Sequence, residues 1–321
     1  MPSLVGKEVG HTGYGAMRLT WHHQPPPEDV CFETLNTALE YGANSWNGGE
    51  LYGTPDYNSL HLLNKYFTKY PENAAKVVLN IKGGLKVGQL IPDGSEANIR
   101  RSVDECLRLL DGKKKIDIFE CARQDPAFPV EHTVRVLAQC VREGKIGAIG
   151  LSEVDAETIR RAHKVHPIAS VEVELSLWAT EILDNDVAKT CAELNIPILA
   201  YSPLGRGLLT GMTSLAEVPE GDIRRHMSRF QEANFQQNLK LMNEVNSLAS
   251  RKGVAPAQIA LGWILSLSNR PGMPTIMPIP GGTTKDKVIQ NTQGVPLLSD
   301  SELAEVDAIL KENTVAGTRQ P

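Results

Sequence analysis

Cysteine is scarce in this chain, and the few cysteines present are not placed to form a disulfide framework or a metal site. There are five among 321 residues, widely separated and without a C-x-x-C pair. Structural zinc sites draw on closely spaced cysteines and histidines, and disulfide-rich domains carry a much higher density of cysteine. We therefore expect reduced cysteines, no bound metal and a cytoplasmic protein.

Long apolar runs and an excess of positive charge are also missing. No apolar run approaches the roughly 18 residues that a membrane-spanning helix requires, and the first residues show no charged-then-apolar leader pattern. Lysine and arginine total 33 against 38 for aspartate and glutamate, which gives a net charge of -5, whereas nucleic-acid-binding proteins usually present a basic face. The composition argues against membrane and nucleic-acid partners and leaves the oligomeric state open.

A third absence bears on the fold class. No G-x-G-x-x-G follows the first expected strand, so a doubly wound sheet of the Rossmann type would lack its phosphate-binding turn. The chain instead alternates short strand-like runs with longer amphipathic helical runs, which favours an α/β fold with a closed parallel (β/α)8 barrel. The expected strands span residues 13–17, 44–47, 76–81, 116–121, 148–151, 170–174, 197–201 and 275–279.

The helical runs carry the periodicity and the end signals of helices. In residues 96–110 the apolar side chains recur every three or four positions, and glycine ends three of the runs, at Gly42, Gly112 and Gly144. The expected helices include residues 28–41, 96–110, 131–142, 156–165 and 185–194.

We expect one domain over residues 1–321, namely a barrel with an N-terminal strand or hairpin and extra C-terminal helices. Two longer connections, residues 21–27 and 204–229, follow the first and seventh strands. Barrel enzymes build their active sites at the C-terminal ends of their strands, so both loops are candidate parts of a site.

Two residues after neighbouring strands could carry acid–base chemistry. Tyr52 follows the second expected strand and Lys82 follows the third. Adjacent barrel strands are close enough for Lys82 to reach the phenol, where its positive charge would stabilise the phenolate and lower the pKa of Tyr52. For an arbitrary pair, a surface tyrosine and a solvated lysine would be the better interpretation. A Schiff-base lysine, as in barrel aldolases, is a further alternative.

Several segments resemble those of the aldo-keto reductase family, and they occur in the family's order along nearly the whole chain. The segment I-L-A-Y-S-P-L-G-R-G-L-L at residues 198–209 is very similar to the family's strand-seven motif, and G-K-I-G-A-I-G-L-S-E at residues 144–153 resembles its strand-five segment. Further similar segments are residues 15–18, 47–53 and 279–291. Residues 47–50 and 119–123 are most similar to the pyridoxal reductase branch.

The resemblance implies roles for individual residues. Tyr52 would be the general acid, Lys82 would tune its pKa, and Asn47 would complete the catalytic group. Ser152 would hydrogen-bond the nicotinamide carboxamide and Tyr201 would stack on the ring. The full set implied for the cofactor is Gly15, Met17, Ser152, Glu153, Glu172, Tyr201, Ser202, Leu204, Arg206, Gly281, Thr283, Lys287, Gln290 and Asn291.

One cation in this set points to NADPH over NADH. Lys287 begins a predicted helix, where it would bind the adenosine 2′-phosphate. On the residues alone, Lys285 and Lys287 would be a solvated helix face. Whether Arg206 grips the pyrophosphate or points to solvent is left open by the sequence.

The chain departs from the family pattern at two catalytic positions. The family usually has an aspartate where this chain has Asn47 and a histidine where it has Ala122. Asn47 can accept a hydrogen bond from Lys82 but brings no charge, so an unneutralised Lys82 should make Tyr52 a stronger acid. Ala122 cannot bind the substrate carbonyl, and the candidates for that role are Arg18, Trp21, Arg123 and the pair His22 and His23, which as a solvated loop pair would have no role.

Two carboxylates stand where the family often has amides. Glu153 and Glu172 could accept hydrogen bonds from the carboxamide, or they could form salt bridges at the strand ends, and the sequence favours neither.

These observations predict an NADPH-dependent oxidoreductase that reduces a small carbonyl substrate. Pyridoxal, reduced to pyridoxine in vitamin B6 metabolism, is the expected substrate, because its ortho hydroxyl polarises its own carbonyl in the absence of a histidine at Ala122. The alternatives are a biosynthetic reductase for another carbonyl compound and a slow nucleotide-binding regulatory subunit similar to the channel-associated β subunits of the family.

Overall fold

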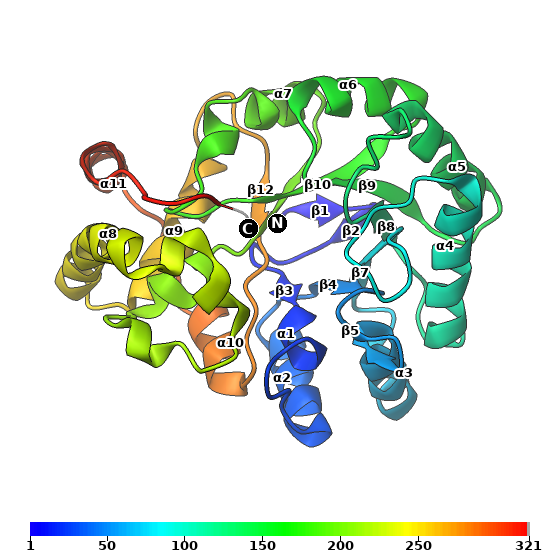
Figure 1. Cartoon of the computed structure of the whole chain (residues 1–321), viewed down its shortest axis with the longest axis horizontal. Helices are drawn as coiled ribbons and strands as arrows, with labels where there is room; N and C mark the ends of the chain where they lie inside the picture. The colour runs from blue at the N-terminus through cyan, green and yellow to red at the C-terminus, as the bar shows by residue number, and fades with distance from the viewer. Residues whose placement is uncertain (320–321) are drawn as a thin grey trace.

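The computed structural model describes residues 1–319, and at its centre a parallel sheet curls into a barrel (Figure 1). The strands follow one another in space in the order of the chain. Hydrogen bonds from the Gly13 and Gly15 amides to the Pro278 and Pro280 carbonyls, 2.9 and 3.1 Å long, join the first strand to the last. The predicted (β/α)8 barrel is confirmed. Its strands are β3 (Tyr14–Gly15), β4 (Ser45–Gly49), β7 (Val78–Gly83), β8 (Ile118–Cys121), β9 (Ala148–Ser152), β10 (Ile168–Glu174), β11 (Ile198–Tyr201) and β12 (Ile276–Pro278).

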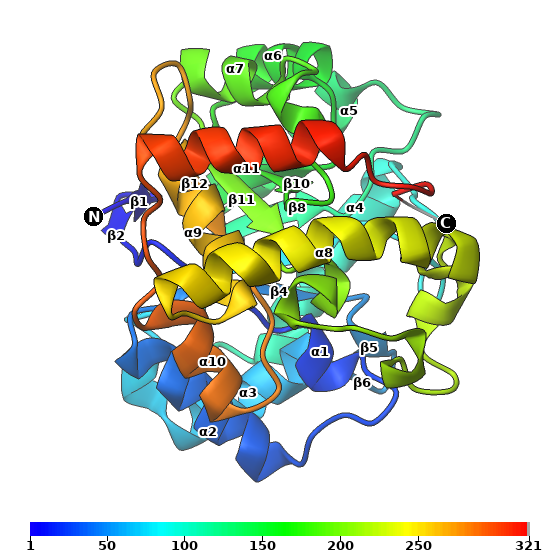
Figure 2. The same cartoon turned by 90° about the vertical axis from the view of Figure 1, so that its left-hand side faces the viewer.

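Helices surround the sheet on its outer face (Figure 1). This ring is formed by α2 (Glu28–Glu40), α3 (Ser59–Lys69), α4 (Glu96–Leu110), α5 (Val130–Arg142), α6 (Ala156–Val165), α7 (Val187–Glu193), α9 (Pro256–Leu267) and α10 (Lys285–Thr292). The extra C-terminal helices that the sequence predicts are α8 (Glu232–Lys252) and α11 (Asp300–Glu312), which lie beside each other along one flank (Figure 2).

Helix α4 shows how local sequence sets the bounds of an element. The Ser95 side chain accepts a hydrogen bond from the Asn98 amide at the N-terminus, and Asp111 ends the helix in a left-handed conformation. An N-cap of this kind contributes about 1 kcal/mol. Ile99 and Val103, on the predicted apolar face, are fully buried. The predicted range 96–110 is therefore confirmed.

The first strand is shorter than predicted. The expected strand 13–17 ends at Gly15, and Met17 is the first residue of the short helix α1 (Met17–Thr20). The chain turns here because the Ala16 amide donates to the Asn47 carbonyl at 2.9 Å, and the Trp21 amide then donates to the Met17 carbonyl at 2.8 Å. Of the other predicted elements, the helices 96–110 and 156–165 have the observed bounds, and the rest differ from the observed ones by at most two residues at either end.

The barrel has an apolar end and an open end. The hairpin of β1 (Ser3–Leu4) and β2 (Lys7–Glu8) lies at the left edge of Figure 2, and α1, β5 (Gly53–Thr54) and β6 (Tyr57–Asn58) lie toward the right. Apolar side chains of the hairpin region and of the strands close the first end. This apolar plug consists of Leu4, Val9, Val78, Leu199, Met277 and Ile279.

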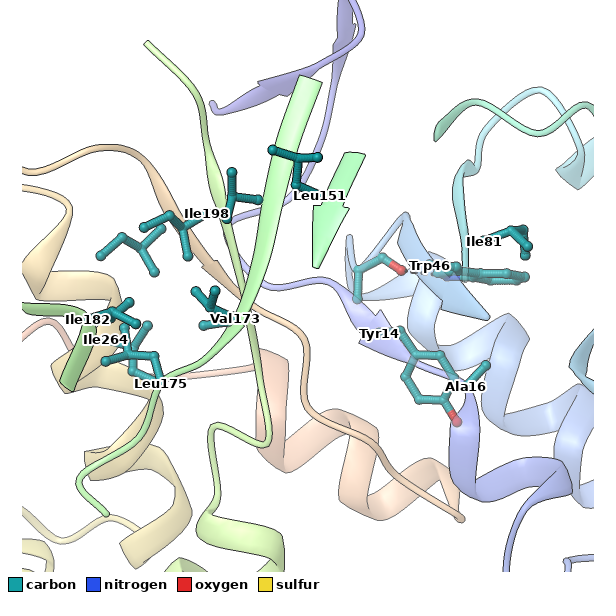
Figure 3. Close-up of a cluster of buried hydrophobic side chains, with 14 of the residues drawn as sticks. Tyr14, Ala16, Trp46, Ile81, Leu151, Val173, Leu175, Ile182, Ile198 and Ile264 are labelled. Carbon is teal, nitrogen blue, oxygen red and sulfur yellow. Dashed lines mark hydrogen bonds between the residues drawn. The ribbon is translucent and has the colours of Figure 1, made fainter. Parts of the chain in front are cut away.

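A larger core fills the space between the sheet and its helices. Figure 3 shows part of it, where Val173 and Leu175 lie close to Ile264 of α9. Residues 204–229, the predicted insertion after β11, form short turns of 3-10 helix that lead toward α8. Within residues 1–319, no helix combines the length and the apolar character of a membrane span.

Candidate active site

The open half of the barrel interior contains five polar side chains, none more than 4% exposed. They are Asn47, Asn80, Lys82, Glu120 and Glu172. The Lys82 Nζ lies 2.5 Å from Oε1 of Glu172 and 3.9 Å from Oε1 of Glu120. Oε2 of Glu172 accepts hydrogen bonds from Nδ2 of Asn47 at 2.6 Å and from Nδ2 of Asn80 at 3.3 Å. The carboxylate of Glu172 is thus the centre of this buried cluster.

The cluster forms because side chains from opposite strands meet inside the barrel. Glu172 is on β10, which lies four positions from β4 in the strand order and therefore across the interior from it. Its chain neighbours Val171 and Val173 belong to the outer core, as the alternation of side chains along a strand requires. The lack of a side chain at Gly150 on β9 leaves space for the Glu120 side chain of β8, since a Cβ at Gly150 would lie 2.8 Å from Oε2 of Glu120.

Tyr52 lies beside this cluster, in the turn that follows β4, and is 7% exposed. Its backbone carbonyl accepts hydrogen bonds from the Thr20 Oγ1 at 2.6 Å and from the Ser59 amide at 3.1 Å. The Trp21 ring lies above it, with the ring centroids 6.1 Å apart. The α1 turn and the start of α3 therefore hold Tyr52 between the cluster and the open end.

Burial determines the acidity of Tyr52. It raises the pKa of the phenol to about 12, and the charges of Glu172 and Glu120 act in the same direction, while the charge of Lys82 and a hydrogen bond with it lower the pKa. The predicted effect of Lys82 on the phenol is present. The prediction that Tyr52 is a stronger acid than usual is wrong, because desolvation outweighs the attraction of Lys82.

The predicted partner of Lys82 also differs from the observed one. Asn47 does not neutralise or accept from the ammonium; its side chain donates to Glu172, and Glu172 pairs with Lys82. Lys82 is therefore neutralised from β10. Of the two roles that the sequence leaves open for Glu172, the salt bridge is the one observed, and a role at the carboxamide is not what this geometry supports.

The pKa of Lys82 follows from the same contacts. Burial lowers the pKa, but the charges of Glu172, Tyr52 and Glu120 and the hydrogen bond with Glu172 together raise it above its ordinary value. A Schiff-base lysine must lose its proton before it attacks a carbonyl. The aldolase alternative is disfavoured by a lysine held in its protonated form.

The second carboxyl group of the cluster, that of Glu120, has a raised pKa. Burial raises the pKa of Glu120 well above its ordinary value, and the negative charge of Glu172 raises it further, against a smaller lowering by Lys82. Two carboxylates beside one ammonium in a dry interior cannot both ionise cheaply.

Ser152 and Tyr201 are the last residues of β9 and β11. Ser152 is 2% exposed, and its Oγ has no hydrogen-bond partner among residues 1–319. The Lys82 Nζ lies 5.0 Å from the centroid of the half-buried Tyr201 ring. An unpartnered hydroxyl and an aromatic face next to the Lys82–Tyr52 pair are what a nicotinamide ring with its carboxamide would need. The residues present fit such a group.

Glu153 and Arg206 are in ion pairs. Both oxygens of Glu153 accept from Arg319 near the C-terminus, at 3.1 and 2.7 Å, and Oε1 also accepts from the Glu174 amide. The Arg206 Nη2 lies 3.4 Å from Oε2 of Glu174. Salt bridging, the second of the roles left open for Glu153, is the one observed, and Arg206 reaches a carboxylate at the mouth of the barrel.

A strip of residues after β12 faces the first strand. A Cβ at Gly15 would lie 2.9 Å from the Ile279 carbonyl oxygen, so the two segments approach closely. Asn291, buried, donates from Nδ2 to the Gly281 carbonyl at 3.3 Å. These contacts hold the segment after β12 against the first strand.

The two lysines of α10 differ in their contacts. Lys285 forms an ion pair with Glu33 at 2.8 Å. Lys287 is exposed, its Nζ lies 3.3 Å from Oγ1 of Thr283, and no carboxylate in the described chain forms an ion pair with it. Of the two, Lys287 is the cation available to an anionic ligand.

The remaining residues predicted for the cofactor lie around the same rim. Ser202 has a positive φ of 50° and is half-buried, as is Leu204, and both follow β11. Met17 is 38% exposed at the start of α1, and Gln290 is exposed on α10.

The residues predicted for the substrate lie on several loops at the open end. Trp21 is 41% exposed above Tyr52, and Ala122 is buried at the end of β8. Arg123, half-buried, donates from Nη1 to the Ala122 carbonyl at 2.7 Å. Arg18 is half-buried, and the charge of Arg224 contributes to lowering its pKa after the larger effect of burial. His22 is bound by its own loop, through contacts of Nδ1 with Gln24.

Three residues of the site were not predicted from the sequence. Glu120 and Asn80 lie in the buried cluster, and Arg319 of the C-terminal segment pairs with Glu153 and Glu174. The signal for Glu120 was available, because a carboxylate that alternates with apolar residues in a buried barrel strand points inward. Among residues 1–319, no three histidine, cysteine, aspartate or glutamate side chains are placed to hold a metal ion.

Comparisons with known proteins agree with this geometry. The model of the family described as "Aldo/keto reductase family" matches residues 12–311. The chain is 40% identical over 326 residues to a protein of Schizosaccharomyces pombe named "Probable pyridoxal reductase 2", which covers 99% of this chain and 97% of that protein. It is 38% identical to the "Putative pyridoxal reductase" of Saccharomyces cerevisiae, with 96% and 95% covered.

Solved structures share the fold. A glycerol dehydrogenase from Gluconobacter oxydans superposes with a TM-score of 0.83 at 25% identity, over 98% of this chain and 95% of that one. A thermostable aldo-keto reductase superposes with a TM-score of 0.72 at 20% identity, over 96% and 98% of the two chains, which shows a likeness of fold alone.

Proposed function

This chain belongs to the aldo/keto reductase family, and we propose that it reduces an aldehyde, with pyridoxal as substrate and NADPH as cofactor. The family consists of oxidoreductases that use nicotinamide dinucleotides on small carbonyl compounds. The observation that carries the proposal is the buried phenol of Tyr52 within reach of the Lys82 ammonium, beside the unpartnered Ser152 hydroxyl.

The residues of the chain supply the proton and the positioning. A nicotinamide cofactor, when bound, would be the source of the hydride. Tyr52 donates its phenolic proton to the carbonyl oxygen, so that the product is an alcohol and the phenolate is left beside Lys82. The ammonium stabilises that phenolate, and the buried surroundings strengthen the attraction because little water screens it. Trp21 and Ala122 border the space for the substrate.

Two observations support pyridoxal. The first is the identity of 40% and 38% to two proteins named as pyridoxal reductases. The second is Ala122, which offers no donor to the carbonyl oxygen. A substrate whose ortho hydroxyl bonds its own carbonyl does not need that donor. A role in vitamin B6 metabolism in the cytoplasm follows as part of the same proposal.

Lys287 supports NADPH over NADH. Its ammonium is at the first turn of α10 without a carboxylate partner in the described chain, where a helix N-terminus also favours anions. Thr283 and Gly281 would border the adenosine phosphate, and Gln290 and Asn291 would face the adenine.

The test is steady-state oxidation of NADPH with pyridoxal by the native chain and by Tyr52→Phe. We expect turnover by the native chain and a loss of roughly 100-fold or more in kcat for the variant, the scale of general acid catalysis. Binding of NADPH, followed by its fluorescence, should be the same for both. Wild-type turnover by Tyr52→Phe would exclude it as the acid.

A second measurement tests the substrate. The 3-O-methyl analogue of pyridoxal lacks the internal hydrogen bond, so it should react more slowly at saturating concentration. Equal rates on the two aldehydes would contradict self-polarisation, and a panel of other aldehydes and ketones that react faster than pyridoxal would overturn the substrate assignment.

A further inference from the structure

Glu172 is the carboxylate that pairs with the Lys82 ammonium. It is on β10, across the barrel interior from Asn47 on β4. We propose that Glu172 is the positioning residue of this reductase: it holds the Lys82 ammonium against Tyr52 from β10, and the amide of Asn47 serves to hold Glu172. The inference rests on the proposed function. Glu172 itself is not placed to touch the substrate.

The contacts divide the work between the two carboxylate oxygens of Glu172. Oε1 accepts from Lys82 at 2.5 Å, whereas Oε2 accepts from Asn47 at 2.6 Å and from Asn80 at 3.3 Å. A carboxylate that accepts from two amides cannot rotate freely. The ammonium bound to its other oxygen is therefore held in one place.

The amide of Asn47 is explained by this arrangement. A second carboxylate at position 47 would lie about where Nδ2 of Asn47 now donates, facing Oε2 of Glu172 at hydrogen-bond distance. Two charged carboxylates at that distance in a dry interior repel strongly. A barrel with Glu172 thus requires a neutral donor at position 47, and Asn47 is the amide of that length.

Glu120 is less suited to the same role. Its nearer oxygen is 3.9 Å from the Lys82 Nζ, against 2.5 Å for Glu172. The other titratable groups that face Lys82 are Tyr52 and Tyr201. The ring centroid of Tyr201 is 5.0 Å from the Lys82 Nζ. Glu172 is the carboxylate in contact with the ammonium.

The experiment is a double-mutant cycle between positions 172 and 47. The kcat and KM for NADPH and pyridoxal are measured for the native chain, Glu172→Gln, Asn47→Asp and the double variant. Glu172→Gln should lower kcat by roughly 10- to 100-fold, because the charge that holds Lys82 is lost. Asn47→Asp alone should also lower kcat, since it adds a repelling carboxylate.

The double variant carries the sharpest expectation. It exchanges the carboxylate and the amide between β10 and β4, so the pair keeps one negative charge and one donor. We expect its kcat to exceed that of both single variants and to return to within about fivefold of the native value. A purely structural role for Glu172 would not be rescued in this way.

The matched control is Glu174→Gln, two residues further along β10. Glu174 is also a buried carboxylate on the inner face, but it lies next to Arg206 and Arg319. Glu174→Gln should change the KM for NADPH. It should leave unchanged the ratios between the kcat values of the four proteins in the cycle. Glu172→Asp provides a conservative variant in case the glutamine variant does not fold, and it should retain more activity than Glu172→Gln.

The outcomes separate this inference from the proposed function. An inactive native chain overturns both. A native chain that reduces pyridoxal, with Glu172→Gln at wild-type kcat, overturns the role of Glu172 alone. A loss in Glu172→Gln that Asn47→Asp does not rescue also overturns it, whereas rescue in kcat with unchanged KM supports it.

Discussion

The two ends of the barrel interior are built from the same strands and have opposite character. At the closed end, β7 contributes Val78 to the apolar plug, and four residues later, toward the open end, it contributes Lys82 to the charged cluster. β11 contributes Leu199 to the plug, and its last residue, Tyr201, packs against the plug while its ring centroid lies 5.0 Å from the Lys82 Nζ. A barrel can therefore keep its stability at one end and its chemistry at the other.

The difference in energetics follows from the side chains. Each fully buried aliphatic side chain of the plug stabilises the fold by about 1.5–3 kcal/mol. A buried ion pair such as Lys82–Glu172 contributes little net stability, because desolvation offsets the attraction. We therefore expect substitutions in the plug to change stability, and substitutions that remove both charges of the ion pair together to change activity with little change in stability.

The largest expected effect comes from replacing the Lys82–Glu172 ion pair with apolar side chains. The double variant Lys82→Met with Glu172→Met should lose roughly 1,000-fold or more in kcat, because Tyr52 loses its partner. Its free energy of unfolding should change by less than about 2 kcal/mol, since both charges and their desolvation costs are removed together. NADPH oxidation and urea unfolding measure the two quantities.

Lys82→Met alone is the control for that variant. It leaves Glu172 buried without its cation, which should destabilise the protein by about 3–5 kcal/mol. A double variant that is less stable than this single one would contradict the offset between desolvation and attraction.

The next prediction concerns the closed end, where a substitution should change stability and leave activity unchanged. Leu4→Ala removes a side chain that is 2% exposed in the plug and should lower the free energy of unfolding by about 2–5 kcal/mol. Because Leu4 lies on the N-terminal hairpin that closes the far end of the barrel, kcat at a temperature where the variant is folded should stay within about twofold of the native value. A parallel fall in kcat would show that the two ends are coupled.

The pH dependence tests the burial of Tyr52. With its pKa raised to about 12, the phenol keeps its proton as the pH rises through the neutral and mildly alkaline range, and it is lost as a donor only near pH 12. The kcat/KM for reduction should therefore show no fall from this group between about pH 7 and 10. An alkaline limb with a midpoint near pH 8, absent from the residual activity of Tyr52→Phe, would contradict this.

The smallest effect concerns the rim. Lys287→Ala should raise the KM for NADPH by roughly three- to tenfold, the size of an exposed charge contact, and leave the KM for NADH unchanged. Lys285→Ala is the matched control, because Lys285 pairs with Glu33, and it should change the KM for NADPH by less than about twofold. Equal effects of the two substitutions would argue for general electrostatics at α10.

Much of the fold was predictable from local patterns. The strand and helix periods, glycines at helix ends and short connections predict a barrel, and the observed elements agree to within one or two residues. Met17 was predicted at the end of a strand, but it begins helix α1. The chain turns there because the amide of the preceding residue, Ala16, donates a hydrogen bond to the carbonyl of Asn47, which is distant in sequence.

The sequence by itself determined which residues follow the strands at the open end, including Tyr52, Lys82 and Ser152, because strand order and alternation are local properties. It did not determine the charge partner of Lys82. That partner, Glu172, is 90 residues away on β10, three places from the strand of Lys82 in the strand order. Only closure of the sheet brings the two together, and only burial raises the pKa of Tyr52, since desolvation depends on everything packed around the phenol.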